Sequence, residues 1–115
     1  MFTLRWTPEA LEKYEQLRAG AGKIAAQRLK SGQGKSSRQE GLFKQVHKTL
    51  RLLAQDPRHP GVQTHAYESL KHPLVPAEKV FEAYAQQNTP SAYRIFWCYG
   101  PARKEITIIA ITPHP

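Results

Sequence analysis

The sequence predicts an α+β fold in which two helices cover one face of a small antiparallel sheet. Three observations predict it: a short alternating strand at the N-terminus, two amphipathic helical stretches after it, and three strand-like segments in series near the C-terminal end. Helices and strands that come in separate runs are typical of a helical layer packed on a sheet. With 115 residues, 40% of them hydrophobic, the chain suits one core, so we expect residues 1–115 to form a single domain.

The first elements are a strand and a helix. Residues 2–6 alternate as a strand does, with three large apolar side chains on one side. Thr7 and Pro8 then supply an N-cap and a first-turn proline, which predict a helix that begins near Pro8. The glycines of segment 20–22 are a potential interruption of this helix, and segment 31–37 has the composition of a flexible connector.

The second helix is predicted from its own start signal. Ser37 and Glu40 have the spacing of a capping box, in which each side chain bonds the backbone at the other's position. Apolar residues at helical spacing follow, and the helix is expected to end before Pro57. The residues predicted to form much of the core from the two helices are Leu11, Leu17, Phe43, Val46, Leu50 and Leu53.

Segment 56–78 predicts an ordered loop. Its four prolines exclude a regular helix or a central strand over most of its length. Residues 62–69 are compatible with one short edge strand.

The C-terminal third predicts a three-stranded meander. Segments 79–87, 92–99 and 105–112 are rich in aromatic and β-branched residues and are separated by turn-forming residues. In the middle strand, alternation places Ile95 and Trp97 on one face, where we expect the helices to pack. Arg94 then lies on the opposite face. A charged side chain within a sheet needs a partner or a ligand.

Positive charge is concentrated in one third of the chain. Between Arg18 and Arg51 there are nine basic residues and one acidic residue, Glu40, and the resulting +8 equals the net charge of the whole protein. A basic helical surface of this kind attracts either phosphate backbones or an acidic protein. A solvated face that keeps the protein soluble is the alternative explanation.

Several site types are not supported by the sequence. The five histidines have neither helix-face spacing nor a cluster of cysteines or carboxylates beside them, so no structural zinc and no cofactor is expected. Cys98 lies within a strand pattern and is expected to be a small buried hydrophobe. The apolar run 106–111 is too short to cross a bilayer, and residues 1–6 lack the apolar stretch of a signal peptide, so a cytoplasmic protein without membrane contact is expected.

Three motifs, together with the element order, carry a resemblance to a known superfamily. Thr7-Pro-Glu-Ala10 opens the first helix, Ala92-Tyr-Arg-Ile-Phe-Trp97 forms the middle strand, and Ile109-Ala-Ile-Thr-Pro-His114 closes the last one. This layout resembles the RelE/ParE superfamily of bacterial type II toxins over most of the chain. Members similar to RelE, HigB and YafQ are small, basic, metal-independent endoribonucleases, most of which cut messenger RNA on the ribosome. Acidic antitoxins neutralise them.

The resemblance implies roles for individual residues. Arg94 matches the middle-strand arginine that contacts the scissile phosphate in RelE-like toxins, and His114 matches a position where YafQ-like members carry a histidine acid. Metal-free RNA cleavage needs a base, cations near the phosphorane and an acid. The further candidates for contact with RNA are Arg103 and Lys104 as phosphate ligands, Tyr84 and Tyr99 as orienting groups, and His65 and His72 as proton donors or phosphate ligands.

Other features favour a second class of function. Glu82 and Tyr84 stand where RelE has lysines. The sequence up to Pro115 also contains no match to the C-terminal helix that carries a catalytic tyrosine in RelE. Glu82 is also able to neutralise Arg94, depending on a hairpin register that the sequence does not determine. The alternatives are therefore a non-enzymatic ParE-like inhibitor of DNA gyrase, or an inactive member that binds nucleic acid or an acidic partner. The sequence does not determine the oligomeric state.

Overall fold

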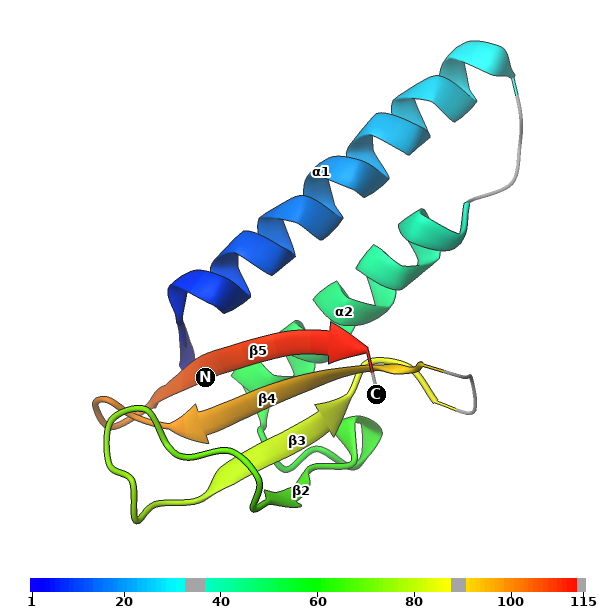
Figure 1. Cartoon of the computed structure of the whole chain (residues 1–115). Coiled ribbons are helices and arrows are strands. Elements are labelled where there is room, and N and C mark those ends of the chain that lie inside the picture. Colours follow the sequence, from blue (N-terminus) through cyan, green and yellow to red (C-terminus); the bar gives the residue numbers. More distant parts are fainter. Residues whose placement is uncertain (33–36, 88–90, 114–115) are drawn as a thin grey trace.

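The computed structural model describes residues 1–32, 37–87 and 91–113. A strand at the N-terminus is followed by two helices, a short 3-10 helix and four further strands (Figure 1). In chain order the elements are β1 (Thr3–Trp6), α1 (Pro8–Ser31), α2 (Arg38–Gln55), η1 (Pro60–Val62), β2 (His65–Tyr67), β3 (Val80–Tyr84), β4 (Tyr93–Tyr99) and β5 (Glu105–Pro113).

The strands of the described residues form one five-stranded sheet, in the order β1-β5-β4-β3-β2. The predicted meander is present as β3, β4 and β5, and the short edge strand in the proline-rich segment is β2, which pairs antiparallel with β3. β1 pairs parallel with β5 at the other edge. The sheet is therefore mixed and larger than the predicted meander, while the α+β class is confirmed.

Helix α1 begins and ends with the expected capping chemistry. The Thr7 hydroxyl accepts a hydrogen bond from the backbone N–H of Ala10 at 3.2 Å. Gly32 ends the helix with φ of 76°, in the left-handed region that glycine adopts without strain. The potential interruption at residues 20–22 does not occur, because the apolar stripe on both sides of the glycines keeps its helical phase.

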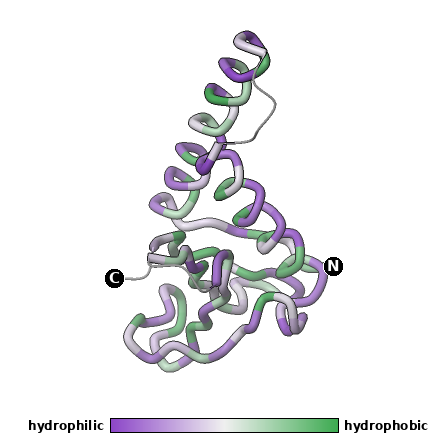
Figure 2. The backbone as a smooth tube through the Cα atoms, turned by 90° about the vertical axis from the view of Figure 1, so that its right-hand side faces the viewer, coloured by the Kyte–Doolittle hydropathy of each residue, from purple (hydrophilic) through white to green (hydrophobic). Residues whose placement is uncertain are grey.

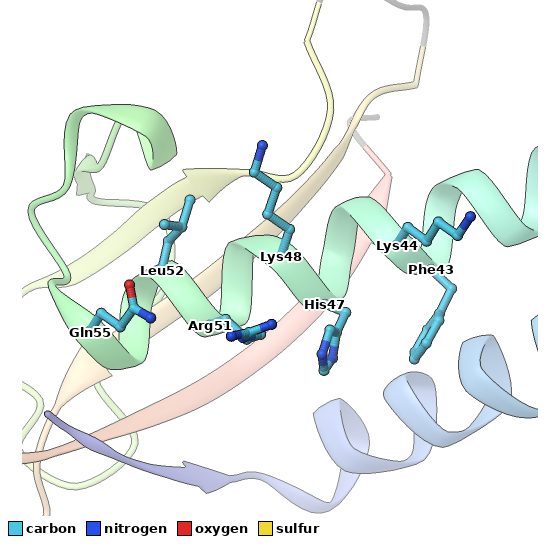
Figure 3. Close-up of a pocket in the computed structure, with 7 residues that line it drawn as sticks. All are labelled: Phe43, Lys44, His47, Lys48, Arg51, Leu52 and Gln55. Atoms are coloured by element: carbon cyan, nitrogen blue, oxygen red, sulfur yellow. The ribbon is translucent and has the colours of Figure 1, made fainter.

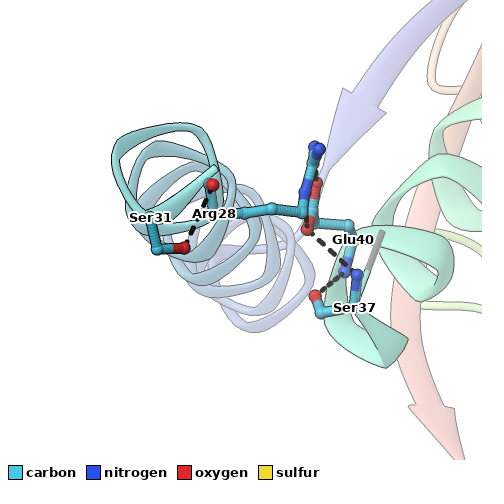
Figure 4. A network of polar contacts seen from close by, with 4 residues as sticks. All are labelled: Arg28, Ser31, Ser37 and Glu40. Atoms are coloured by element: carbon cyan, nitrogen blue, oxygen red, sulfur yellow. Dashed lines mark hydrogen bonds and ion pairs between the residues drawn. The ribbon is translucent and has the colours of Figure 1, made fainter. Parts of the chain in front are cut away.

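Helix α2 begins with the predicted capping box, and the same glutamate ties the two helices together. The Ser37 hydroxyl accepts from the N–H of Glu40 at 3.1 Å, and the Glu40 carboxylate accepts from the N–H of Ser37 at 3.0 Å. Arg28 of α1 also donates to this carboxylate (Figure 4). The hydrogen bond from Arg28, followed by that from Ser37, lowers the pKa of Glu40 from 4.5 to about 2.

The core lies between the two helices and one face of the sheet. Ile95 and Trp97 are fully buried there, which confirms the predicted face of the middle strand. Val46, Leu50 and Leu53 belong to the same cluster, as predicted. The other buried members are Ala10, Val62, Phe81, Ala83, Ile106, Ile108 and Ile111.

Three of the predicted core positions on the helices differ in burial. Leu17 is partly buried and packs against the core, and Phe43 is also partly buried. Leu11 was predicted wrongly, since 44% of its surface is exposed. Hydrophobic and hydrophilic residues alternate along both helices, which extend as a hairpin away from the sheet (Figure 2). Leu11 lies near the edge of the apolar stripe of α1, where helical spacing alone does not decide burial.

The overall shape is elongated, with extents of 52 × 27 × 23 Å. In Figure 1 the far halves of α1 and α2 extend past the sheet, while the other face of the sheet carries no helix. No helix within residues 1–32, 37–87 and 91–113 is long and apolar enough to cross a membrane.

Candidate functional site

The sheet face opposite the helices is divided into a covered half and an open half. On the covered half, the ring of Tyr67 packs on Phe96 with centroids 4.7 Å apart. Nε2 of His72 lies 3.0 Å from the carbonyl oxygen of Tyr99, so segment 68–78 is attached to the end of β4. The open half lies at the other end of the strands, where β4 begins.

Four side chains from three strands meet on the open half. Nη1 of Arg94 lies 2.5 Å from Oε2 of Glu82, and Nε2 of His65 lies 2.6 Å from Oε1 of the same carboxylate. The guanidinium carbon of Arg94 is 5.1 Å from the ring centroid of Tyr84, a cation–π distance. The rings of His65 and Tyr84 are 5.5 Å apart. We call Arg94, Glu82, His65 and Tyr84 the open-face cluster.

The strand register explains why these residues meet. His65 is the Cα partner of Glu82 in the β2–β3 pair, and Tyr84 is the partner of Arg94 in the β3–β4 pair. Partners in a pair share a face, and residues two apart along a strand share it as well. All four side chains therefore project from the same face. The pairing of Glu82 with Arg94 that the sequence left open is present.

Burial differs sharply within the open-face cluster. The Glu82 side chain is 1% exposed, that of Arg94 17% and that of His65 48%. The cluster thus has a buried carboxylate at its base and two cationic or proton-bearing groups nearer to solvent. Nε of Arg94 is buried and has no hydrogen-bond partner in the part of the chain that is described.

Both ring nitrogens of His65 face oxygen atoms that accept hydrogen bonds. Nδ1 of His65 faces the carbonyl oxygen of Gln63 at 3.3 Å, while Nε2 faces the carboxylate of Glu82. A carbonyl oxygen and a carboxylate both accept hydrogen bonds, so this geometry satisfies both ring nitrogens when each carries a proton. In that state both N–H groups are used within the protein, so His65 contacts a ligand only by exchanging one of them, and the bond from Nδ1 to Gln63 is the longer of the two.

His72 and Tyr99, two other predicted contacts, lie at the covered end. Nδ1 of His72 accepts from the backbone N–H groups of Leu74 and Val75, at 3.1 and 2.9 Å, and the ring is 4% exposed. Tyr99 points to the helix-packed face, where its ring contacts Trp97 at 5.0 Å. The structure does not bring either residue to the open-face cluster. Their contacts order segment 70–78 and the core.

Arg103 and Lys104 lie in the exposed turn between β4 and β5, at the far end of the hairpin from Arg94. Tyr99 is five positions after Arg94 along the strand, which corresponds to roughly 17 Å. Nζ of Lys104 is 5.2 Å from the ring centroid of Phe2. These two cations are therefore separate from the open-face cluster.

His114 lies outside the described residues. The strand that leads to it ends beside the open-face cluster, because Thr112 is the partner of Arg94 and Pro113 the partner of Tyr93.

Two other kinds of chemistry have no support among the described residues. Burial raises the pKa of the Cys98 thiol to about 11, so it is a poor nucleophile. No three His, Cys, Asp or Glu side chains gather as metal ligands within the ranges that the structure describes.

A second surface lies on α2, away from the sheet. A shallow cleft of about 280 Å³ runs beside this helix and combines cations with apolar side chains (Figure 3). Lys44, Lys48 and Arg51 are exposed there, and none of them forms an ion pair with any described residue. We call these three residues the basic α2 surface. The full lining is Phe43, Lys44, His47, Lys48, Arg51, Leu52 and Gln55.

The double contact of Glu82, with Arg94 and with His65, was not predicted from the sequence. The available signal was the alternation of His65 and Tyr67 within a possible edge strand, which places His65 on one face. The register that sets His65 opposite Glu82 was needed as well, and a short strand among prolines does not determine it.

No family model and no curated protein matches the chain. Solved structures do match it over nearly their whole length. A YoeB/ParE toxin from Agrobacterium tumefaciens is 12% identical with a TM-score of 0.58, over 98% of this chain and 99% of that one. The YoeB dimer from Staphylococcus aureus is 11% identical with a TM-score of 0.58, over 99% and 98%. A metal-bound toxin from Helicobacter pylori is 15% identical with a TM-score of 0.51, over 99% and 96%.

These likenesses show that the chain has the fold of RelE/ParE toxins, as its sequence motifs predicted. At 11 to 15% identity the likeness is one of fold, and activity has to be argued from the side chains.

Proposed function

We propose that the protein is the toxin of a type II toxin–antitoxin system and a metal-independent endoribonuclease that cleaves messenger RNA, most effectively on the ribosome. The proposal is supported first by the open-face cluster. Arg94 and His65 are held together by one buried carboxylate on the half of the sheet that neither helix nor segment 68–78 covers. Two hydrogen-bond donors in a partly shielded position suit a phosphate group.

The proposed chemistry divides between the cluster and the end of β5. Arg94 stabilises the negative charge of the phosphorane, and His114 is the acid that protonates the leaving 5′-oxygen. The pairing of Pro113 with Tyr93 supports this role, because His114 is the next residue along the chain. His65 is a second phosphate ligand, and Tyr84, below the guanidinium, orients the attacking group or a base. Arg103 and Lys104 contact a more distant phosphate of the same RNA.

The partner we propose is an acidic antitoxin. The basic α2 surface offers three cations beside an apolar cleft, and an acidic segment that orders on binding neutralises the cations while it buries apolar side chains. This surface and the open-face cluster lie on opposite sides of the sheet. An antitoxin that acts by blocking the RNA site has to extend around an edge of the sheet.

A specific observation favours the alternative, a non-enzymatic ParE-like inhibitor of DNA gyrase or an inactive binder. Glu82 occupies Nη1 of Arg94 and neutralises its charge. If this ion pair is only structural, the guanidinium is not available for phosphorane stabilisation. The two functions then differ in one measurable product, namely new RNA ends.

The decisive experiment maps transcript ends after induction of the protein in a bacterial host, beside Arg94→Ala and the control Arg38→Ala. Arg38 is an exposed arginine at the start of α2, so its loss changes the net charge equally. We expect new 5′ ends within coding regions for the wild type and for Arg38→Ala, and none for Arg94→Ala. Cleavage of a free oligoribonucleotide by the purified protein should persist in EDTA. Growth arrest without new transcript ends would reject the ribonuclease and favour the gyrase inhibitor, which a supercoiling assay then tests.

A further inference from the structure

The two oxygens of the Glu82 carboxylate serve two different donors. Oε2 faces Nη1 of Arg94 at 2.5 Å, and Oε1 faces Nε2 of His65 at 2.6 Å. The carboxylate is 1% exposed, whereas both of its partners reach solvent. A buried acid that bridges two more exposed donors has a fixed position, because the sheet encloses it, and its partners take their positions from it.

Holding one nitrogen of a guanidinium restricts the whole group. The guanidinium is planar and its five N–H bonds point in set directions, so the contact at Nη1 limits where Nη2 points. The ring of Tyr84 lies against the guanidinium at 5.1 Å and limits rotation further. For His65, the contact between Nε2 and Glu82 directs the ring, and Nδ1, 3.3 Å from the carbonyl oxygen of Gln63, is the nitrogen that exchanges its longer bond for the phosphate.

We propose that Glu82 is a positioning residue, which holds Arg94 and His65 in one arrangement so that both contact the same phosphate of the RNA. This inference rests on the proposed ribonuclease function and extends it to a residue that does not itself touch the substrate. It also gives the ion pair a role in the reaction rather than in the fold alone.

Charge and position lead to opposite expectations for the removal of Glu82. A carboxylate beside a phosphate site repels the ligand, so on charge alone its loss strengthens RNA binding and leaves cleavage equal or faster. If Glu82 positions the two donors, its loss instead lowers kcat while binding is kept, because a misplacement of about 1 Å near the reacting group costs on the order of 10²-fold in rate. A variant that keeps its affinity for RNA but has a lower kcat therefore identifies Glu82 as a positioning residue.

The test compares wild type with Glu82→Gln, which preserves side-chain volume. Circular dichroism and a thermal melt establish that the variant is folded. Affinity is measured with a 2′-O-methyl oligoribonucleotide, which cannot be cleaved, and kcat with the unmodified RNA on programmed ribosomes. We expect an equal or tighter Kd and a kcat lowered by roughly 10- to 100-fold. An unchanged or raised kcat in the folded variant overturns the proposal.

A second measurement uses the wild type and needs no variant to fold. The side-chain NMR signals of Arg94 and His65 are followed during titration with the 2′-O-methyl oligoribonucleotide. Positioning on one phosphate requires both signals to shift together with the same Kd. A response at Arg94 alone, at His65 alone or at neither overturns the proposal, also in the case where Glu82→Gln does not fold.

The same titration separates this proposal from the function on which it rests. If the wild type shifts both signals but produces no cleavage on ribosomes, the ribonuclease proposal fails while the shared phosphate site stands. If cleavage occurs but the two signals respond independently, the ribonuclease stands and the positioning role is rejected.

Discussion

Arg28 and Glu40 form a two-point contact between the helices: Nε of Arg28 lies 3.2 Å from Oε1 of Glu40, and Nη2 lies 2.8 Å from Oε2. The side chains are 21% and 6% exposed, so the pair is partly shielded from water. It joins the far halves of α1 and α2, where Figure 1 shows no sheet beneath them. This contact therefore ties the two helices together beyond the part of the hairpin that packs on the sheet.

The first prediction is a pH dependence that this contact creates. The pKa of Glu40 is about 2 in the folded protein against 4.5 ordinarily, so the ionised pair contributes its full stability above about pH 4.5, and the contribution is lost as pH falls toward 2. The stability difference between wild type and Glu40→Gln should therefore shrink as pH is lowered through this range. Urea unfolding at several pH values measures it, and a difference that stays constant would contradict the role of the pair.

The second prediction concerns the core. Leu50 is 3% exposed on α2, and Leu50→Ala should lower the free energy of unfolding by about 2–5 kcal/mol. Leu11→Ala removes the same atoms from a residue that is 44% exposed, and should cost less than about 0.5 kcal/mol. Urea denaturation of the two variants side by side provides the comparison. Equal losses of stability in the two variants would contradict the burial described for one of the helices.

The third prediction separates the catalytic from the structural role of Arg94. Arg94→Ala should leave the protein folded and remove toxicity, since an arginine that stabilises phosphorane charge supplies about 3–4 kcal/mol to the transition state. If the protein unfolds instead, the ion pair with Glu82 is structural, because the variant leaves a buried carboxylate without its strongest partner. A thermal melt and a growth assay on the same variant distinguish these outcomes.

The fourth prediction concerns His114. His114→Ala should lower the cleavage rate by about 10²–10⁴-fold while RNA affinity is kept, as expected when a general acid is lost. His72→Ala is the matched control. Among residues 1–32, 37–87 and 91–113, His72 bonds only backbone groups of segment 70–78 and of Tyr99, so its loss should lower stability and spare the rate per folded molecule. Single-turnover kinetics measures the cleavage rate of both variants. An unchanged rate for His114→Ala would show that His114 is not the acid.

The fifth prediction concerns the basic α2 surface. A variant with Lys44, Lys48 and Arg51 changed to Gln should bind the proposed acidic antitoxin more weakly, and its affinity should depend less on salt. The control replaces Lys23, Lys30 and Arg38, which carry the same charge elsewhere on the helices. Calorimetry at two ionic strengths reads out both effects. An affinity that is equal for the two variants would place the antitoxin on another surface.

Local signals in the sequence were sufficient for the helices. Thr7 and Ser37 cap the two helices, as predicted. These caps could be predicted because capping depends on residues only three positions apart in the sequence. The face of the middle strand was also predictable, since Trp97 is too large and apolar to lie on the exposed side.

Non-local pairing was not predictable. Nothing near Thr3 indicates that its partner is Glu105, and parallel pairing leaves no turn signal between the strands. The contact between Arg94 and Glu82 needed the β3–β4 register, in which a slip of one residue moves every side chain to the other face. The bridge to His65 needed a second register as well. Candidate residues were thus identifiable one at a time, while their arrangement was not.

The parallel pairing of β1 with β5 also constrains folding during synthesis. The first strand to be synthesised, Thr3–Trp6, pairs with the last one and cannot do so until residues 105–108 have been made. Contacts so distant in sequence form late and slow folding. The five-stranded sheet that carries Arg94 is therefore completed only after residues 105–108 have been synthesised.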